Sequence, residues 1–179
     1  MSKRLTLILG GRRAGKSTYA QRLAHERAGA GRVLFVATAE ALDDDMSARI
    51  QKHRKDRPAE WDTLETPLDI VGELAPVADR YEVVLLDCLT LWVTNLMLAE
   101  SDFNVLEETS HLLDCYQAGD ASWIVVSNEV GLGIVPSTPL GRAFADQLGR
   151  VNQQIAANAA EVTFIAAGLP LQLKPSPRT

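Results

Sequence analysis

The chain has little of what would place it outside the cell or inside a membrane. Its 179 residues include only two cysteines, Cys88 and Cys115, too few for a disulfide framework and typical of a reducing compartment. No apolar run approaches the ~20 residues that a membrane-spanning helix needs, so we expect no integral membrane association. The run Leu5–Leu9 stops at Gly10, too soon for a signal peptide, and is interpreted as a strand. We therefore expect a cytoplasmic protein.

Concentrated positive charge is also lacking. Lys and Arg number 18 against 23 Asp and Glu, a net charge of −5, and no segment collects the basic residues that would neutralise a nucleic-acid backbone. Nucleic acid is therefore not an expected partner. With 46% hydrophobic and 23% charged residues, the composition is typical of a globular domain. We expect one domain over residues 1–174 and a frayed tail over 175–179.

Short apolar runs alternate with longer segments of helical periodicity. The runs predict buried strands at Leu5–Leu9, Val33–Ala37, Val83–Leu86, Ser122–Val126 and Val162–Ala166. The periodic segments predict helices at Lys16–Arg27, Asp43–Arg54, Leu68–Arg80, Leu89–Ala99, Val105–Tyr116 and Gly141–Ala159. This alternation favours an α/β fold of three layers, in which helices flank a mainly parallel central sheet. Two long connections, Lys55–Pro67 and Asn128–Pro139, are where function is expected.

The most specific motif is a glycine-rich loop between the first strand and the first helix. It has the pattern G-x-x-x-x-G-K-S of a P-loop. Glycines let backbone N–H groups point at phosphates, Lys16 neutralises the β- and γ-phosphates, and the Ser17 hydroxyl can bind Mg²⁺. A structural glycine turn is the weaker alternative. The motif consists of Gly10, Gly11, Arg12, Arg13, Ala14, Gly15, Lys16 and Ser17.

A second metal-binding candidate closes the third predicted strand. Asp87 follows Val83–Leu86, where a carboxylate at the carboxyl end of a strand helps to hold Mg²⁺ through water, the role of a Walker B residue. The alternative is that Asp87 caps the helix that follows, and both roles can coexist. Small GTPases carry an Asn-Lys-x-Asp motif after a late strand, whereas this chain has Ser127-Asn128-Glu129-Val130 there. A GTPase switch is therefore disfavoured, and so is a nucleoside-monophosphate kinase, because no arginine-rich lid is visible.

One histidine lies among charged residues on a predicted helix face. Asp45, Arg49 and His53 are spaced at i, i+4 and i+8. A neutral imidazole, with an ordinary pKa near ~6.5, can attack phosphorus without first losing a proton. Spacing alone favours an exposed histidine, and this interpretation is kept for His25 and His111.

The chain resembles the bifunctional adenosylcobinamide kinase and adenosylcobinamide-phosphate guanylyltransferase family of cobalamin biosynthesis. The resemblance runs nearly end to end. The segments Asn128–Pro136 and His53–Glu65 are specific to this group. The matching positions are Gly10–Ser17, Ala37–Glu40, Asp44, Met46, Arg49, Ile50, His53, Arg57, Pro58, Trp61, Glu65, Leu86–Thr90, Trp92, Asn95, Leu96, Ser127–Pro136, Arg142, Phe144, Asp146 and Gly149–Gln153.

The resemblance implies a RecA-like P-loop fold and two reactions. ATP or GTP phosphorylates the aminopropanol hydroxyl of adenosylcobinamide, and GMP is then transferred from GTP to adenosylcobinamide phosphate, with release of pyrophosphate. It implies a GMP-histidine intermediate on His53, with Lys16 as the other catalytic residue and Mg²⁺ as cofactor. It also implies a homo-oligomer, a trimer in such enzymes. The implied nucleotide site adds Ala37, Thr38, Ala39, Arg57, Pro58, Glu65 and Asp87 to the P-loop.

Several alternatives stay open at this point. A P-loop kinase of another small molecule, with His53 as a bystander, and a non-catalytic GTP-binding sensor both fit the P-loop alone. The Asn128–Pro139 loop either borders the corrinoid or is a tight structural turn. Arg142, Asp146 and Arg150 share a helix face and either serve the site or form a solvated ion-pair ladder. The apolar helix Leu89–Leu98 either forms an interface or is buried within the subunit.

Overall fold

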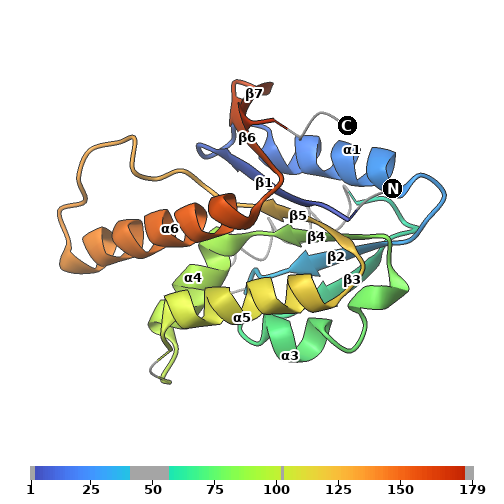
Figure 1. Ribbon diagram of the computed structural model, residues 1–179. Helices are drawn as coiled ribbons and strands as arrows, with labels where there is room; N and C mark the ends of the chain where they lie inside the picture. Colours follow the sequence, from blue (N-terminus) through green and yellow to red (C-terminus); the bar gives the residue numbers. More distant parts are fainter. Residues whose placement is uncertain (1–2, 41–56, 102, 176–179) are drawn as a thin grey trace.

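The computed structural model describes residues 3–40, 57–101 and 103–175. The helix predicted over Asp43–Arg54, together with His53, lies outside these residues. In the described part, seven strands form one sheet of order β3-β2-β4-β5-β1-β6-β7 (Figure 1). The strands are β1 (Leu5–Gly10), β2 (Val33–Ala37), β3 (Asp62–Glu65), β4 (Val83–Asp87), β5 (Ser122–Val126), β6 (Glu161–Ala166) and β7 (Leu169–Lys174).

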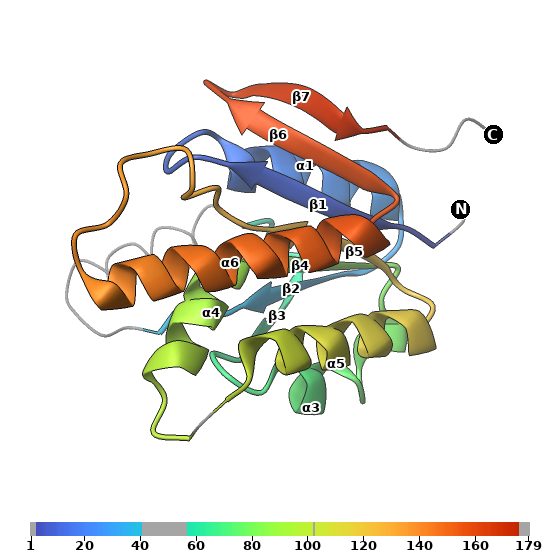
Figure 2. The same cartoon turned by 60° about the vertical axis from the view of Figure 1, so that its left-hand side comes forward.

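Helices cover both faces of this sheet, so the predicted three layers are confirmed. Helix α1 lies on one face, and α3, α4, α5 and α6 lie on the other (Figures 1 and 2). Two separate cores result: Ala20 and Ala24 of α1 pack with Phe35, whereas Trp92 of α4 and Ile155 of α6 belong to the larger core. The helices are α1 (Lys16–Ala28), α3 (Ile70–Leu74), α4 (Leu89–Leu98), α5 (Val105–Ala118) and α6 (Pro139–Asn158), with a 3₁₀ turn, η1, at Ala78–Arg80.

The sheet is parallel except for β7, which pairs antiparallel with β6. The five apolar runs all form strands: β1, β2, β4 and β5 are buried almost throughout, and β6 is buried at Val162, Thr163 and Ile165. Strands β3 and β7 were not predicted. Both lie at the edges of the sheet, and their largely exposed residues lack the continuous apolar run of a central strand.

Two helix predictions need comment. The single helix expected over Leu68–Arg80 is wrong: α3 ends before Pro76, which has no N–H to continue the helix, and only the turn η1 follows. The alternatives for the apolar helix α4 are partly resolved, because Leu89, Trp92 and Val93 are buried inside the subunit. Within the described ranges, no helix is long and apolar enough to cross a membrane.

Candidate active site

The P-loop connects β1 to α1 and depends on two glycines. Gly10 has φ +152°, and a Cβ there would overlap the carbonyl oxygen of Ile165 on the neighbouring strand. Gly15 has φ +97°, and its Cβ would lie 3.3 Å from Gly168 Cα. Side chains at these two positions would be strained or would collide with backbone. Glycine is therefore required by the fold as well as by the phosphates that the loop would bind.

Neighbouring segments brace the P-loop on both sides. On one side, Glu129 N–H donates to Gly10 O at 3.1 Å, and on the other Gly168 N–H donates to Ala14 O at 2.9 Å. The turn between β6 and β7 and the connection after β5 therefore hold the loop between them (Figure 2). Arg13 has φ +58°, an uncommon conformation for a residue with a side chain, and both Arg12 and Arg13 are exposed. The P-loop is thus held in shape before any ligand binds.

Lys16 is the buried cation of the site. It is 9% exposed and its Nζ donates to Gly11 O at 2.7 Å, so the ammonium is folded back over the loop. Burial lowers the pKa of Lys16 from 10.5, and the neighbouring Cys88 and Asp87 side chains oppose this shift. A cation with few water contacts interacts strongly with an anion that enters the loop. The geometry suits Lys16 to a phosphate chain.

The carboxyl ends of β2 and β4 bring the next site residues together. Ala37 and Asp87 are register partners, and the fully buried Thr38 hydroxyl exchanges two hydrogen bonds with Cys88, to its O at 2.7 Å and from its N at 3.0 Å. Burial raises the pKa of the Cys88 thiol to about 11, so this thiol is protonated near neutral pH. Asn95 Nδ2 donates to Thr38 O at 2.9 Å and so fixes the same edge from α4.

Asp87 is not the capping residue of α4. The N-cap position belongs to Cys88, whose side chain makes no capping hydrogen bond. Asp87 instead lies close enough to Lys16 to affect the pKa of its ammonium. Ser17, half-buried in the first turn of α1, supplies a hydroxyl to the same region. One hydroxyl and one carboxylate are oxygen donors of the kind that Mg²⁺ accepts beside phosphate and water, so these two residues fit that ion.

The remaining residues that were predicted to bind the nucleotide lie on or next to β2 and β3. Glu65 is the register partner of Ala37, so Glu65, Ala37 and Asp87 end three adjacent strands. The Arg57 guanidinium lies 3.7 Å from the centre of the Phe35 ring and donates to Thr63 Oγ1 at 3.3 Å. Pro58 and Ala39 are half-buried. Phe35 belongs to the α1 core, so Arg57 approaches from the α1 side. His53 lies outside the described residues.

Hydrogen bonds for which the sequence analysis predicted no role connect α4 and α6 to the P-loop. Thr90 Oγ1 accepts from Asn128 N at 2.9 Å, and Asn152 Nδ2 donates to Asn128 O at 3.0 Å. Helices α4 and α6 thus hold the residue before Glu129, which in turn contacts Gly10. Thr90, Asn128 and Asn152 all lie in segments that carry the family resemblance, which was the available signal. What could not be deduced from spacing is that they meet.

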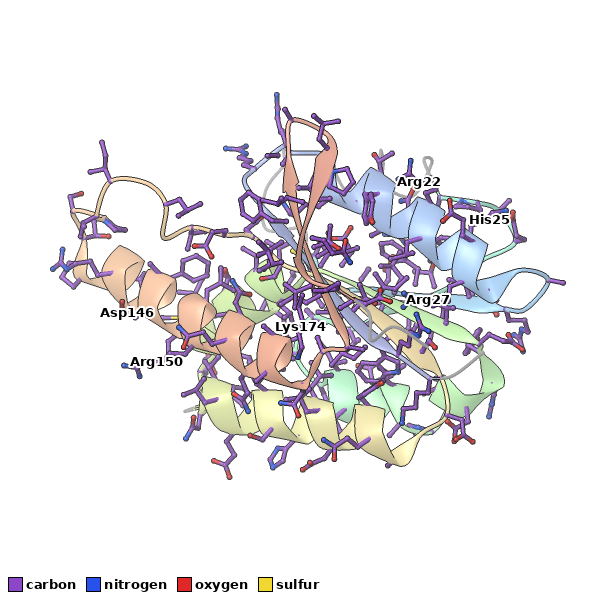
Figure 3. All side chains as sticks on the ribbon, turned by 45° about the horizontal axis from the view of Figure 1, so that its top comes forward. Arg22, His25, Arg27, Asp146, Arg150 and Lys174 are labelled. Atoms are coloured by element: carbon purple, nitrogen blue, oxygen red, sulfur yellow. The ribbon has the colours of Figure 1, made fainter. Side chains whose placement is uncertain are left out.

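The ion-pair ladder considered for α6 does not form. Arg142 donates to the carbonyl oxygens of Pro136 and Ser137 at 3.0 and 2.9 Å, and so closes the end of the Asn128–Pro139 loop. Among the ion pairs of the described ranges, none joins Arg142, Asp146 and Arg150 to one another. Asp146 and Arg150 are exposed on α6 (Figure 3).

Comparison with known proteins gives matches over almost the whole chain. The family model described as cobinamide kinase / cobinamide phosphate guanyltransferase matches residues 6–173. The bifunctional adenosylcobalamin biosynthesis protein CobP of Pseudomonas aeruginosa is 46% identical over 171 residues, which cover 96% of this chain and 98% of that protein. The proteins named CobU from Escherichia coli and Salmonella typhimurium are 39% and 40% identical, each over 95% of this chain and 99% of its own length.

Solved structures agree on the fold. The flagellar accessory protein FlaH of Methanocaldococcus jannaschii has a TM-score of 0.58 and 16% identity, over 97% of this chain and 79% of that chain. A second solved structure, an ATPase domain, has a TM-score of 0.56 and 15% identity, over 90% of this chain and 69% of that chain. Identities this low show the fold alone, which is the P-loop α/β architecture predicted from the sequence.

Proposed function

We propose that this chain, which belongs to the cobinamide kinase / cobinamide phosphate guanyltransferase family, catalyses both reactions with nucleotide bound at the P-loop. The observation that carries the proposal is the braced P-loop with buried Lys16, placed beside Asp87 and Thr38. The substrates are GTP or ATP and adenosylcobinamide for the first reaction, and GTP and adenosylcobinamide phosphate for the second.

In the kinase reaction, the oxygen of the aminopropanol hydroxyl attacks the γ-phosphorus and the hydroxyl proton is lost to solvent. The bond from that phosphorus to the β,γ-bridging oxygen breaks. Negative charge develops on the nucleoside diphosphate that leaves. Lys16 and the backbone N–H groups of the P-loop stabilise this charge, because they are fixed in place before the reaction. Ser17 and Asp87 would hold Mg²⁺, which would neutralise further charge on the phosphates.

In the guanylyltransferase reaction, an imidazole nitrogen of His53 attacks the α-phosphorus of GTP and pyrophosphate leaves. A phosphate oxygen of adenosylcobinamide phosphate then attacks the same phosphorus, the phosphorus–nitrogen bond breaks, and the imidazole is regenerated. Lys16, with Arg57 on the α1 side, is suited to the charge on the departing pyrophosphate. Because GMP is first transferred to the imidazole, the corrinoid need not react with GTP directly.

The same site must present the γ-phosphorus in one reaction and the α-phosphorus in the other. We propose that the nucleotide binds in two poses, one for each reaction. Glu65, Ala37 and Asp87 line one edge of the sheet, and this edge can hold the nucleoside in either pose. The Asn128–Pro139 loop, bonded to the P-loop through Glu129 and exposing Leu132, Ile134 and Val135, is proposed to border the corrinoid.

Labelling with GTP that carries ³²P at the α-phosphate tests the proposal. We expect a protein-bound label that is labile in acid and stable in alkali, present in the wild type and absent in His53→Ala. His25→Ala and His111→Ala are the controls, because both side chains are exposed in the structure, and they keep the label. A kinase of another substrate with His53 as a bystander would give no such label. A non-catalytic sensor would release no pyrophosphate when adenosylcobinamide phosphate is added.

Location and assembly complete the proposal. Cys88 and Cys115 are both free thiols, which supports the cytoplasm as the compartment. A homo-oligomer, a trimer by the family resemblance, is proposed as the assembled form. Exposed apolar side chains support assembly, since large unpaired apolar surfaces are uncommon on monomers. The side chains are Leu132, Ile134, Val135, Leu140, Leu169, Leu171 and Leu173.

A further inference from the structure

The chain that leaves β5 continues to pair with β1 beyond the end of the strand. Ser127 N–H donates to Ile8 O at 2.9 Å, and Glu129 N–H donates to Gly10 O at 3.1 Å. The two donors are two residues apart, and so are the two acceptors, which is the spacing of a parallel ladder. The backbone from residue 127 to residue 129 therefore stays extended beside β1.

This extended path determines the face of the sheet on which the Asn128 side chain lies. Successive side chains of an extended chain alternate between the two faces. Val126 packs in the core beneath α1 and is the register partner of Asp87 on β4. Asn128, two residues further along, therefore lies on the face that α1 covers. Ser127 and Glu129 lie on the other face, where Glu129 lines a groove beside α6.

On that face, Asn128 lies at the part of the sheet edge that faces the end of a bound triphosphate. Strand β5 lies between β1, which leads into the P-loop, and β4, which ends at Asp87 (Figure 2). The Asp87 carboxylate is close enough to Lys16 to affect the pKa of its ammonium. A P-loop backbone holds the α- and β-phosphates, and its lysine reaches the β- and γ-phosphates. The γ-phosphoryl group is therefore expected beside Lys16 and Asp87, next to Asn128.

The backbone of Asn128 is fixed, whereas its side chain has no partner among the described residues. Its N–H donates to Thr90 Oγ1 at 2.9 Å, and its carbonyl oxygen accepts from Asn152 Nδ2 at 3.0 Å. The residue is half-buried, and its carboxamide makes no hydrogen bond within the part of the chain that the structure describes. A carboxamide has two N–H donors and one acceptor to offer a ligand.

We propose that Asn128 is a catalytic residue of the kinase reaction, in which its Nδ2 donates a hydrogen bond to an oxygen of the γ-phosphoryl group. This inference rests on the proposed function. Charge on the oxygens of the transferred group is stabilised best by donors that are in place beforehand, and Thr90 and Asn152 hold Asn128 in place. The carboxamide gives up no proton. The oxygen–phosphorus bonds that form and break remain those of the kinase reaction.

Steady-state kinetics of three variants tests the inference. Asn128→Ala removes the donor, and Asn128→Asp keeps the size of the side chain but replaces the donor with a carboxylate that repels phosphate. We expect both to lower the kcat of adenosylcobinamide phosphorylation about 10²-fold, the usual effect of losing one donor to a reacting oxyanion. The KM for adenosylcobinamide stays unchanged. The matched control is Ser127→Ala, the preceding residue on the opposite face, which keeps the wild-type kcat.

Two further measurements separate a catalytic role from a structural one. The bonds that hold the Asn128 backbone do not involve its side chain, so Asn128→Ala keeps the Tm of the wild type. The protein-bound label from GTP carrying ³²P at the α-phosphate is also kept in both Asn128 variants, because that reaction takes place at the α-phosphorus and not at the γ-phosphorus.

The outcomes distinguish failure of this inference from failure of the proposed function. A wild-type kcat in both Asn128 variants would overturn the inference and leave the proposed function intact. An equal loss of kcat in Ser127→Ala would also overturn it, because the face of the sheet would then not matter. Loss of the label in parallel with the kinase activity would overturn the assignment to the γ-phosphoryl group. A wild type that phosphorylates no adenosylcobinamide would overturn the proposed function itself. Asn128→Asp, of unchanged size, provides the test if Asn128→Ala does not fold.

Discussion

Replacement of Gly10 by alanine tests whether the P-loop depends on close packing against the sheet. Gly10 is the last residue of β1 and the register partner of Ile165 on β6. An added Cβ would overlap the Ile165 carbonyl oxygen, which is backbone and has no rotamer by which to move away. Gly11, the next residue, is the matched control: no atom lies within 4 Å of its Cβ position and its φ needs no glycine.

The expected loss of stability follows from two contributions. A residue with a side chain in a sparsely populated φ region costs about 1–3 kcal/mol. Moving β6 away from the new methyl group disturbs a buried strand pair, which adds about 1–3 kcal/mol, the usual cost of overpacking. The free energy of unfolding of Gly10→Ala therefore falls by about 2–6 kcal/mol, whereas that of Gly11→Ala changes by less than ~1 kcal/mol.

Thermal unfolding measures this difference. For a domain of this size, 1 kcal/mol corresponds to a Tm change of about 2–4 °C, so Gly10→Ala lowers the Tm by at least ~4 °C and Gly11→Ala does not. The Tm increase that GTP produces in the wild type is also lost in Gly10→Ala, because Gly10 O and the loop that follows are displaced. Equal Tm values for the two variants would refute the claim that β6 fixes the P-loop by contact with Gly10.

Two further predictions concern charge. Glu161 forms ion pairs with Arg4 at 3.1 Å and Arg27 at 3.0 Å, and its side chain is only 12% exposed, so Glu161→Gln leaves buried positive charge and costs about 3–5 kcal/mol of unfolding free energy. The control Glu26→Gln breaks the exposed Arg22–Glu26 pair and lowers the free energy of unfolding by less than ~0.5 kcal/mol. Urea denaturation measures both variants, and similar losses in the two would contradict this interpretation. Because burial lowers the pKa of Lys16, the Lys16 ammonium loses its positive charge as the pH rises, before the ordinary lysine pKa of 10.5 is reached. The affinity for GTP therefore falls with rising pH, measured by calorimetry, and Lys16→Arg removes this dependence, since arginine stays charged.

The parts of this protein that were predictable from sequence are those with a strong local signal. The five central strands are continuous apolar runs, and the P-loop is a motif whose context, strand before and helix after, is itself visible in the sequence. The edge strand β3 gave no such signal, because its exposed residues gain their pairing only from β2. The end of α3 could have been predicted from Pro76. The helical spacing of the apolar residues around Pro76 instead favoured one continuous helix, which was wrong.

The order of the strands within the sheet could not be predicted from the sequence, and this order determines which site residues lie near one another. Strand β5 lies between β1, which carries the P-loop, and β4, which carries Asp87, although β5 comes later in the chain than both. Its carboxyl end therefore lies between the carboxyl ends of β1 and β4. Asn128, two residues after β5, is held there by Thr90 and Asn152.

This arrangement gives a physical reason for the buried polar residue of α6. A connection that leaves the sheet beside a phosphate-binding loop has backbone N–H and C=O groups that no strand can satisfy, and side chains from α4 and α6 must satisfy them. Thr90 does this for the N–H of Asn128 and Asn152 does it for the carbonyl oxygen, so the buried amide of Asn152 fixes the point at which the chain leaves β5.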